Sequence, residues 1–336
     1  MTIKRMTFCR STRIIGMLKS VSVALAAVAC VGLAQAQSYP TKPIRLIVPW
    51  PAGGGVDTSA RMFSQQLSER LGQPIVIENK PGAGGNIGTA IVANEKPDGY
   101  TLLMASISPN SVNPHLYATT GFDPVKDFSP IAYAYTVPSF LVVPTASPFK
   151  TAQELIDHIK ANPGKLNYGS SGIGSSQHLA AIMLQMTTGI DAVHIPFKGT
   201  APAETALIAN QLDFMMDPPT CFPHIRGGKL RVLAVGSPTR NPAMQDVPTF
   251  DELGIPGVHT AVYYGFMAPA NTPKEIIDRL NKEVNEILQT EEVRNRITNM
   301  GGMITVAPAE DFKKYTDSEL ARYGEIIKRA GIEKIQ

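Results

Sequence analysis

The stretch VPWPAGGGVDTSAR, residues 48–61, closes an apolar run with two prolines and then places three glycines ahead of a helical pattern. The β-branched run at 43–50 predicts a strand, and the helix that follows is expected to end at Gly72. Asp57 stands where an N-cap would open this helix. Its apolar face is marked by Ala60, Phe63, Leu67 and Leu71. Glycines between a strand and a helix let another molecule approach the backbone closely, so this turn is the first candidate binding site.

Strand-like and helix-like runs alternate along the rest of the chain. Thr151 with Glu154 predicts a capping box, and Thr272 is expected to cap a helix that has Pro273 in its first turn. This rhythm is typical of an α/β protein with mostly parallel sheets flanked by helices. Further strands are expected at 74–79, 100–106, 165–170, 192–197, 212–217 and 229–237, and helices at 151–164, 175–189, 202–211, 271–289 and 309–330.

Two extended, proline-interrupted segments, 137–149 and 262–273, have the character of hinges. If the chain crosses between two lobes there, residues 37–137 plus 265–336 form lobe 1 and residues 138–264 form lobe 2. A double crossover between two α/β lobes leaves a ligand cleft between them.

Residues 1–36 have the features of a secretory signal peptide. A basic start precedes the apolar run VSVALAAVACVGLA, which is too short to span a bilayer, and Ala34 and Ala36 supply the small residues of a cleavage site. We therefore predict a secreted protein that is cleaved after Ala36. A lipoprotein processed at Cys30 is the alternative, but no Leu stands three residues before it.

Removal of this leader changes the charge and the cysteine content. It holds five of the 31 Lys and Arg residues and none of the 28 Asp and Glu residues, so the remaining 300 residues carry a net charge of −2. No basic stripe remains to bind nucleic acid. Of the three cysteines only Cys221 stays, so no internal disulfide is expected.

The glycine turns do not fit the nucleotide-binding motifs. PAGGGVDTS lacks the lysine of a P-loop; GAGGNIG (82–88) has its last glycine one place late for G-x-G-x-x-G, and GIGSSQ (172–177) lacks it. The histidines show no paired metal spacing, and no G-x-S-x-G elbow is present. We expect no cofactor, no metal and no catalysis.

Two of the glycine turns share one design. Residues 51–57 and 169–176 each follow a strand and open a helix, and neither contains Lys or Arg. Free backbone N–H groups at a helix start bind anions, and a carboxylate fits such a seat. Glycines that only permit tight turns remain the alternative for either loop alone. Lys198 could pair with an anion or lie in solvent, Asp217 could face a ligand or cap a turn, and His178 could donate to a ligand or be structural.

Long motifs in the chain resemble the Bug family, the periplasmic solute-binding receptors of tripartite tricarboxylate transport systems. They are YPTKPIRLIVPWPAGGGVDTSAR (39–61), VIENKPGAGGNIGTAIVANEKPDGYTLLMAS (76–106), NPHLY (113–117), HIPFKGTAPAETALIANQLDFMMD (194–217) and GKLRVLAVGSPTRNPAMQDVPTFDELGIPG (228–257). The resemblance implies a type II periplasmic-binding fold whose two α/β lobes close on a small carboxylate: a di- or tricarboxylate, an acidic amino acid or an aromatic acid.

In the family two loops bind one carboxylate group between them, and these loops map onto residues 51–57 and 170–177. The ligand-binding residues expected on this basis are Trp50, Ala52, Gly53, Gly54, Asp57, Ser170, Ser171, Gly174, Ser175, Ser176 and Gln177. Candidates for the far end of the ligand are Ser106, Lys198, Thr200, Asp217 and Phe222. The expected partners are membrane permease subunits, and the carrier is expected to be a monomer. A secreted serine-dependent hydrolase using the loop at 169–176, or a ligand sensor for a membrane kinase, are the alternatives.

Overall fold

The first sheet has six strands in the order β11-β4-β10-β3-β1-β2. A computed structural model describes residues 39–336 of the chain, and the predicted signal peptide lies outside them. Strands β1, β2 and β3 pair in parallel, whereas β10 runs antiparallel to both β3 and β4. The strands are β1 (Ile44–Val48), β2 (Ile75–Asn79), β3 (Thr101–Ser106), β4 (Phe128–Val137), β10 (Val262–Pro269) and β11 (Met303–Ile304).

The second sheet has five strands in the order β7-β6-β8-β5-β9. Strand β6 pairs in parallel with β7 and β8, and β5 runs antiparallel to β8 and β9. The strands are β5 (Phe140–Pro144), β6 (Asn167–Ser170), β7 (Val193–Pro196), β8 (Phe214–Asp217) and β9 (Leu230–Val235). The α/β class expected from the sequence is confirmed. Both sheets are mixed: parallel pairs join β1 to β2 and β3 and join β6 to β7 and β8, and the other pairs are antiparallel.

The two sheets repeat one strand arrangement. In the first sheet β1 lies between β2 and β3, and β3 is followed by the antiparallel β10; in the second, β6 lies between β7 and β8, and β8 is followed by the antiparallel β5. The turn after β1 and the turn after β6 therefore occupy equivalent positions. Both turns open helices, α2 (Gly55–Leu71) and α6 (Ser176–Thr188).

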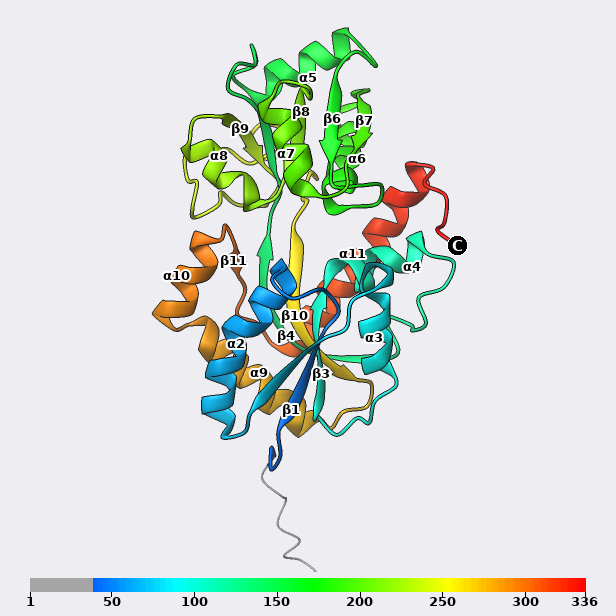
Figure 1. Cartoon of the computed structure of the whole chain (residues 1–336), viewed down its shortest axis with the longest axis vertical. Helices are drawn as coiled ribbons and strands as arrows, with labels where there is room; N and C mark the ends of the chain where they lie inside the picture. The colour runs from blue at the N-terminus through cyan, green and yellow to red at the C-terminus, as the bar shows by residue number, and fades with distance from the viewer. Residues whose placement is uncertain (1–38) are drawn as a thin grey trace, which may run out of the picture. The chain divides into compact units, whose positions relative to one another are not determined.

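Helices cover both faces of the first sheet (Figure 1). On one face Phe63 of α2 meets Phe266 edge-on, with ring centroids 5.4 Å apart, and α2 packs on α9. On the other face α3 and α11 share a core with the strands. The remaining helical elements are η1 (Ala83–Gly85), α3 (Asn86–Ala93), η2 (Ser108–Val112), α4 (Asn113–Leu116), α5 (Ala152–Ala161), α7 (Thr200–Ile208), η3 (Pro219–Cys221), α8 (Phe222–Arg226), α9 (Lys274–Leu288), α10 (Glu291–Asn299) and α11 (Ala309–Arg329).

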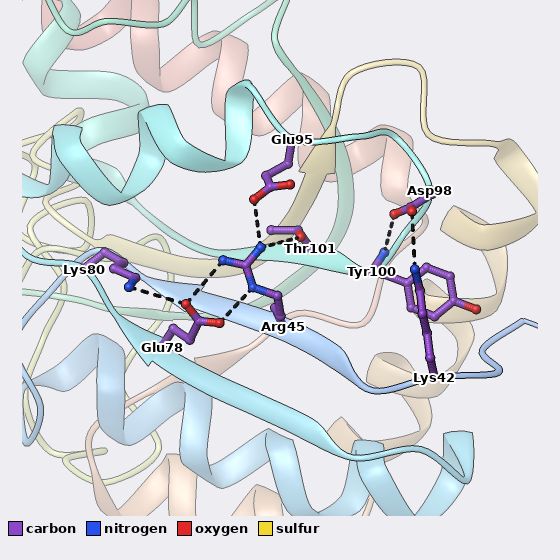
Figure 2. Close-up of polar contacts among 8 residues, drawn as sticks. All are labelled: Lys42, Arg45, Glu78, Lys80, Glu95, Asp98, Tyr100 and Thr101. Atoms are coloured by element: carbon purple, nitrogen blue, oxygen red, sulfur yellow. Dashed lines mark hydrogen bonds and ion pairs between the residues drawn. The ribbon is translucent and has the colours of Figure 1, made fainter.

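A polar cluster fixes the beginning of β1 against its neighbours (Figure 2). The Arg45 guanidinium donates to Glu78 on β2 at 2.8 Å and to Glu95, beyond α3, at 2.8 Å. These partners raise the pKa of Arg45, and Arg45 in turn lowers the pKa of Glu78. Lys42 lies beside Asp98 and over the ring of Tyr100. The cluster is at the opposite end of β1 from the glycine turn, so it supports the strand register rather than a ligand site.

The chain crosses between the sheets twice. The first crossing is residues 138–139, and the second is residues 236–261. Gly236 donates its N–H to the carbonyl of Ser139 at 2.9 Å, and Thr260 donates its N–H to the carbonyl of Gly236 at 2.9 Å. The hydroxyl of Ser139 donates to the carbonyl of Thr260 at 3.2 Å. The two crossings are thus joined by hydrogen bonds.

Two local expectations from the sequence are wrong. Residues 262–269 are not an extended hinge, because they form β10 and pair with β4 from Val262 onward. Thr272 does not cap α9: Pro273 is the cap residue, and the Thr272 hydroxyl donates to the carbonyl of Pro269 at 2.8 Å. The cap at Thr151 is confirmed, since its hydroxyl accepts the N–H of Glu154 at 3.2 Å. The predicted lobe boundaries stay a prediction.

Candidate functional site

Loop 1, residues 51–54, connects β1 to α2 and is exposed throughout. Gly53 has a φ of 84°, a left-handed conformation that side chains rarely adopt. Gly54 is the N-cap residue of α2 and offers no side chain to the first-turn N–H groups. The sequence therefore leaves the helix start accessible, where a capping side chain would cover it.

Asp57 holds loop 1 in place from the first turn of α2. Its carboxylate accepts three hydrogen bonds: from Nε of Arg61 at 2.8 Å, from the backbone N–H of Gly53 at 2.9 Å and from the side-chain amide of Asn79 at 2.9 Å. These donors, Arg61 foremost, lower the pKa of Asp57 to about 2. The expectation that Asp57 is the N-cap is wrong: it is the third residue of the helix, and its side chain reaches back to the loop.

Trp50 and Ser106 are also brought together beside loop 1. The indole Nε1 of Trp50 donates to the Ser106 hydroxyl at 3.1 Å, and the carbonyl of Trp50 accepts the amide of Asn79 at 2.9 Å. Ser106 is the last residue of β3, which pairs with β1, so strand pairing sets this contact. Asn79 binds both Trp50 and Asp57. It was not selected from the sequence, where its only distinguishing feature is that it ends the parallel neighbour β2.

Loop 2, residues 171–175, connects β6 to α6. Gly174 has a φ of 76°, and a Cβ added there would lie 2.6 Å from Cδ2 of Leu116 in α4. Loop 2 therefore packs closely on α4, which lies between β3 and β4 in the chain. Ser175 is the N-cap of α6, and its hydroxyl accepts the N–H of His178 at 3.3 Å.

Most N–H groups inside loop 2 donate hydrogen bonds within the protein, chiefly to buried side chains. Gln177 accepts the N–H of Ser171 at 2.8 Å, and the Ser170 hydroxyl accepts that of Gly172 at 3.1 Å. The remaining donors of interest are the first N–H groups of the helices, which have no partner within a helix: Ser176 and Gln177 in α6, with Gly55 and Val56 in α2. Ser176, the first residue of α6, is half-buried.

Asp217, the last residue of β8, is completely buried. It accepts the side-chain amide of Gln177 at 2.6 Å, and its other oxygen has no hydrogen-bond donor. Burial, followed by the charge of Glu204, raises the pKa of Asp217 well above its ordinary value. Glu204 on α7 was not singled out from the sequence, because only the packing of α7 brings it to β8.

The other candidates for the far end of a ligand take no part in the hydrogen bonds described above. Lys198 is exposed, and Thr200 is the half-buried first residue of α7. Phe222 is buried against Phe140, with ring centroids 5.1 Å apart, and belongs to the core of the second sheet.

The hydrolase alternative receives little support from the geometry. The Ser170 hydroxyl lies 2.7 Å from Nε2 of His194, but Ser170 is 0% exposed, so a substrate carbonyl has no access to it. Cys221 is buried, and burial raises the pKa of its thiol. Within residues 39–336 no group of three or more His, Cys, Asp or Glu side chains could hold a metal ion. None of the helices described has the length and apolar character needed to cross a membrane.

Known proteins of one family match this chain along most of its length. The model of the tripartite tricarboxylate transporter family receptor matches residues 59–332. Protein BugT of Bordetella pertussis is 35% identical over 301 residues, which cover 88% of this chain and 91% of BugT. A protein encoded between tcbD and tcbE in Pseudomonas sp. is 35% identical over 292 residues, covering 86% of this chain and 87% of its own length.

Solved structures agree with this assignment. The periplasmic binding protein BugD is 35% identical with a TM-score of 0.72, covering 88% of this chain and 100% of BugD. Rpa4515 of R. palustris, solved with adipate, is 33% identical with a TM-score of 0.76, covering 88% of this chain and 100% of its own. MatC of Rhodopseudomonas palustris, solved with bound malate, is 31% identical with a TM-score of 0.71, covering 86% and 100%. The two-lobed periplasmic-binding fold is confirmed, and the chain belongs to the tripartite tricarboxylate transporter receptor family, as its resemblance to the Bug proteins implied.

Proposed function

We propose that this protein is a periplasmic receptor that binds a small organic carboxylate between its two lobes and delivers it to the membrane subunits of a tripartite tricarboxylate transporter. The observation that carries the proposal is the equivalent placement of loops 1 and 2. Each follows the strand that lies between two parallel neighbours, and each opens a helix. A ligand at the carboxyl ends of such strands is the common arrangement in open α/β sheets.

The chemistry of the two helix starts favours an anion. Unpaired N–H groups and the helix dipole attract negative charge, and each terminus contributes about 0.3–2 kcal/mol. The loops themselves carry no cationic side chain, so a carboxylate would be held by oriented peptide groups. Asp57, Gln177 and His178 keep these groups in position by bonding other N–H groups of the loops.

The related structures support the ligand class. One relative was solved with adipate and another with bound malate, and both of these ligands are dicarboxylates. We propose that loops 1 and 2, with the first N–H groups of α2 and α6, surround one carboxylate group of the ligand. The buried candidates Asp57, Ser170 and Gln177 hold these loops in place. In this arrangement one lobe is built on the first sheet, which includes β10 from Val262 onward, and the other lobe is built on the second sheet.

Native mass spectrometry of freshly purified protein, followed by a thermal-shift panel, tests this function. We expect a co-purified organic acid, and a raised melting temperature with at least one member of a panel of di- and tricarboxylates, acidic amino acids and aromatic acids. A saturating ligand at 100 times its Kd stabilises a protein by about 2.7 kcal/mol, which such an assay resolves. An unchanged melting temperature across the panel contradicts the ligand class. Co-purification with transporter subunits from membranes tests the partner.

A further inference from the structure

Two histidines are stacked behind loop 2. The rings of His178, on α6, and His194, on β7, have centroids 3.8 Å apart and planes inclined by 12°. Tyr168 of β6 stacks on His194 at 5.0 Å. His178 is buried, and His194 is half-buried. The pair therefore forms part of the packing between α6 and the second sheet, directly under the loop.

His178 forms a hydrogen bond with loop 2, and His194 forms one with Ser170, the residue just before the loop. The backbone N–H of Gly174 donates to Nδ1 of His178 at 3.1 Å. Because a peptide N–H can only donate, Nδ1 must be unprotonated and the ring must carry its proton on Nε2. At the other end Nε2 of His194 lies 2.7 Å from the Ser170 hydroxyl, which also bonds Gly172. A proton added to His178 Nδ1 would remove the acceptor of Gly174.

The surroundings favour the neutral form of both rings. Burial, with a smaller contribution from His194, lowers the pKa of His178 to about 4, and burial lowers the pKa of His194. Tyr168 from β6 faces the pair. Asp217 from β8 bonds the neighbouring Gln177 of α6, and Glu204 from α7 interacts with Asp217. Arg322 from α11 contacts α6 further along, at Met183. Burial raises the pKa of Asp217 well above its ordinary value.

We propose that His178 is a positioning residue for loop 2: stacked on His194 and unprotonated at Nδ1, it holds the Gly174 N–H and keeps the loop in its binding geometry only while it is neutral. This inference rests on the proposed function for its biological meaning, since loop 2 is half of the proposed carboxylate seat. When the loop opens, His178 regains water and an ordinary pKa near 6.5. Acid therefore favours the open loop from about pH 6.5 downward, until the lowered pKa of the closed form is reached.

Two substitutions separate the acceptor from the ring. His178→Asn places an amide oxygen near the position of Nδ1, so it keeps an acceptor for Gly174 but cannot titrate. His178→Phe keeps an aromatic ring for stacking and removes the acceptor. His158→Asn, on the exposed face of α5, is the matched control. Circular dichroism establishes that each variant is folded.

Hydrogen exchange of the Gly174 amide, corrected for its intrinsic rate, is measured on the ligand-free protein between pH 7.5 and pH 5. We expect its protection to fall more than about tenfold in the wild type and in His158→Asn, and less than about twofold in His178→Asn. In His178→Phe the protection should already be lost at pH 7.5. Constant protection in the wild type, or an equal fall in His178→Asn, overturns the inference.

Affinity for malate and adipate at pH 7.5 is the second measurement. His178→Phe should weaken binding by about tenfold, and His178→Asn should restore it to within about twofold of the wild type, since a bound loop needs only the acceptor. Equal weakening in both variants also overturns the inference. If no member of the carboxylate panel binds while the exchange result holds, the positioning role stands and the ligand class proposed above fails. If an acid binds but Gly174 protection ignores pH, the function stands and this inference fails.

Discussion

Gln177 joins Asp217 to loop 2: its amide donates to the buried carboxyl across 2.6 Å, while its carbonyl oxygen accepts the N–H of Ser171 at 2.8 Å. Asp217 Oδ2 and Glu204 Oε1 are both buried without a hydrogen-bond donor from another group. A proton on Asp217 satisfies this arrangement, because two ionised carboxylates cannot share a buried site. The buried carboxyl of Asp217, whose pKa is raised by burial, therefore supports the loop through Gln177.

Asp217→Asn is expected to change how stability depends on pH. Asp217 has a raised pKa in the folded state, so its contribution is fully present below the ordinary Asp pKa and is lost as pH rises toward the raised value. Asparagine cannot ionise, and it can still accept from Gln177. Relative to the wild type, Asp217→Asn should raise the free energy of urea unfolding by about 1–3 kcal/mol more at pH 8 than at pH 5. The same substitution at exposed Asp191 is the control, and an equal effect at both pH values at position 217 would contradict a buried neutral acid.

Asp57→Ala should have the opposite pH dependence. The folded pKa of Asp57 is lowered to about 2, so its contribution is present above the ordinary Asp pKa and is lost as pH falls from about 4 to about 2. At pH 7 the loss of bonds to Arg61, Gly53 and Asn79 should cost about 2–3 kcal/mol. Urea unfolding at pH 7 and at pH 3 measures the difference, which should shrink in acid. Arg61→Gln removes only a partly exposed ion pair and should cost less than about 1 kcal/mol. A cost for Asp57→Ala as small as that of Arg61→Gln would show that the carboxylate does not hold loop 1.

Gly53→Ala and Gly72→Ala form a matched pair for loop 1. Both glycines have positive φ, 84° and 69°, and a Cβ at either position meets nothing within 4 Å. Each substitution should therefore cost about 1 kcal/mol of unfolding free energy through backbone strain alone. Only Gly53 lies in the proposed site, so we expect Gly53→Ala to weaken carboxylate binding by at least about fivefold, measured by calorimetry with malate or adipate. Equal affinities for the two variants would remove loop 1 from the site.

The single tryptophan, Trp50, should report occupation of loop 1 by its fluorescence. Ser106→Ala removes the partner of its indole N–H, which should cost about 1 kcal/mol and move the emission to longer wavelength as the ring gains water. Ligand binding to the wild type should change the emission. Ser318→Ala, an exposed position on α11, is the control and should behave as the wild type. Emission that is unaffected by a ligand known to bind would place Trp50 away from the site.

Local patterns predicted the strand–turn–helix units because their determinants are neighbours in sequence. The αL glycine Gly72 ends α2 as expected, and Thr151 caps α5 through its own turn. These features need only propensity and short-range hydrogen bonds. The glycine turns at 51–54 and 171–175 were found for the same reason.

The supporting contacts could not be predicted in this way. Asn79 reaches Asp57 because β1 and β2 pair in parallel with Val48 opposite Asn79, and His194 meets His178 because β7 lies beside β6. Asp57 resembles a cap in sequence, but Gly54 takes that position once the loop turns at Gly53. Strand register and helix packing decide such contacts, and neither is encoded in a short window of residues.

The hydrogen bonds among Ser139, Gly236 and Thr260 limit how one sheet can rotate against the other. Because these hydrogen bonds join the two crossing segments, a rotation of one segment moves the other. We call the backbone of Ser139, Gly236 and Thr260 the narrow band about which both bend. A Cβ at Gly236 would lie 2.1 Å from Oγ1 of Thr260, which leaves that band no room for a side chain. A motion of one sheet against the other therefore has to bend both crossing segments together, at the backbone of Ser139, Gly236 and Thr260.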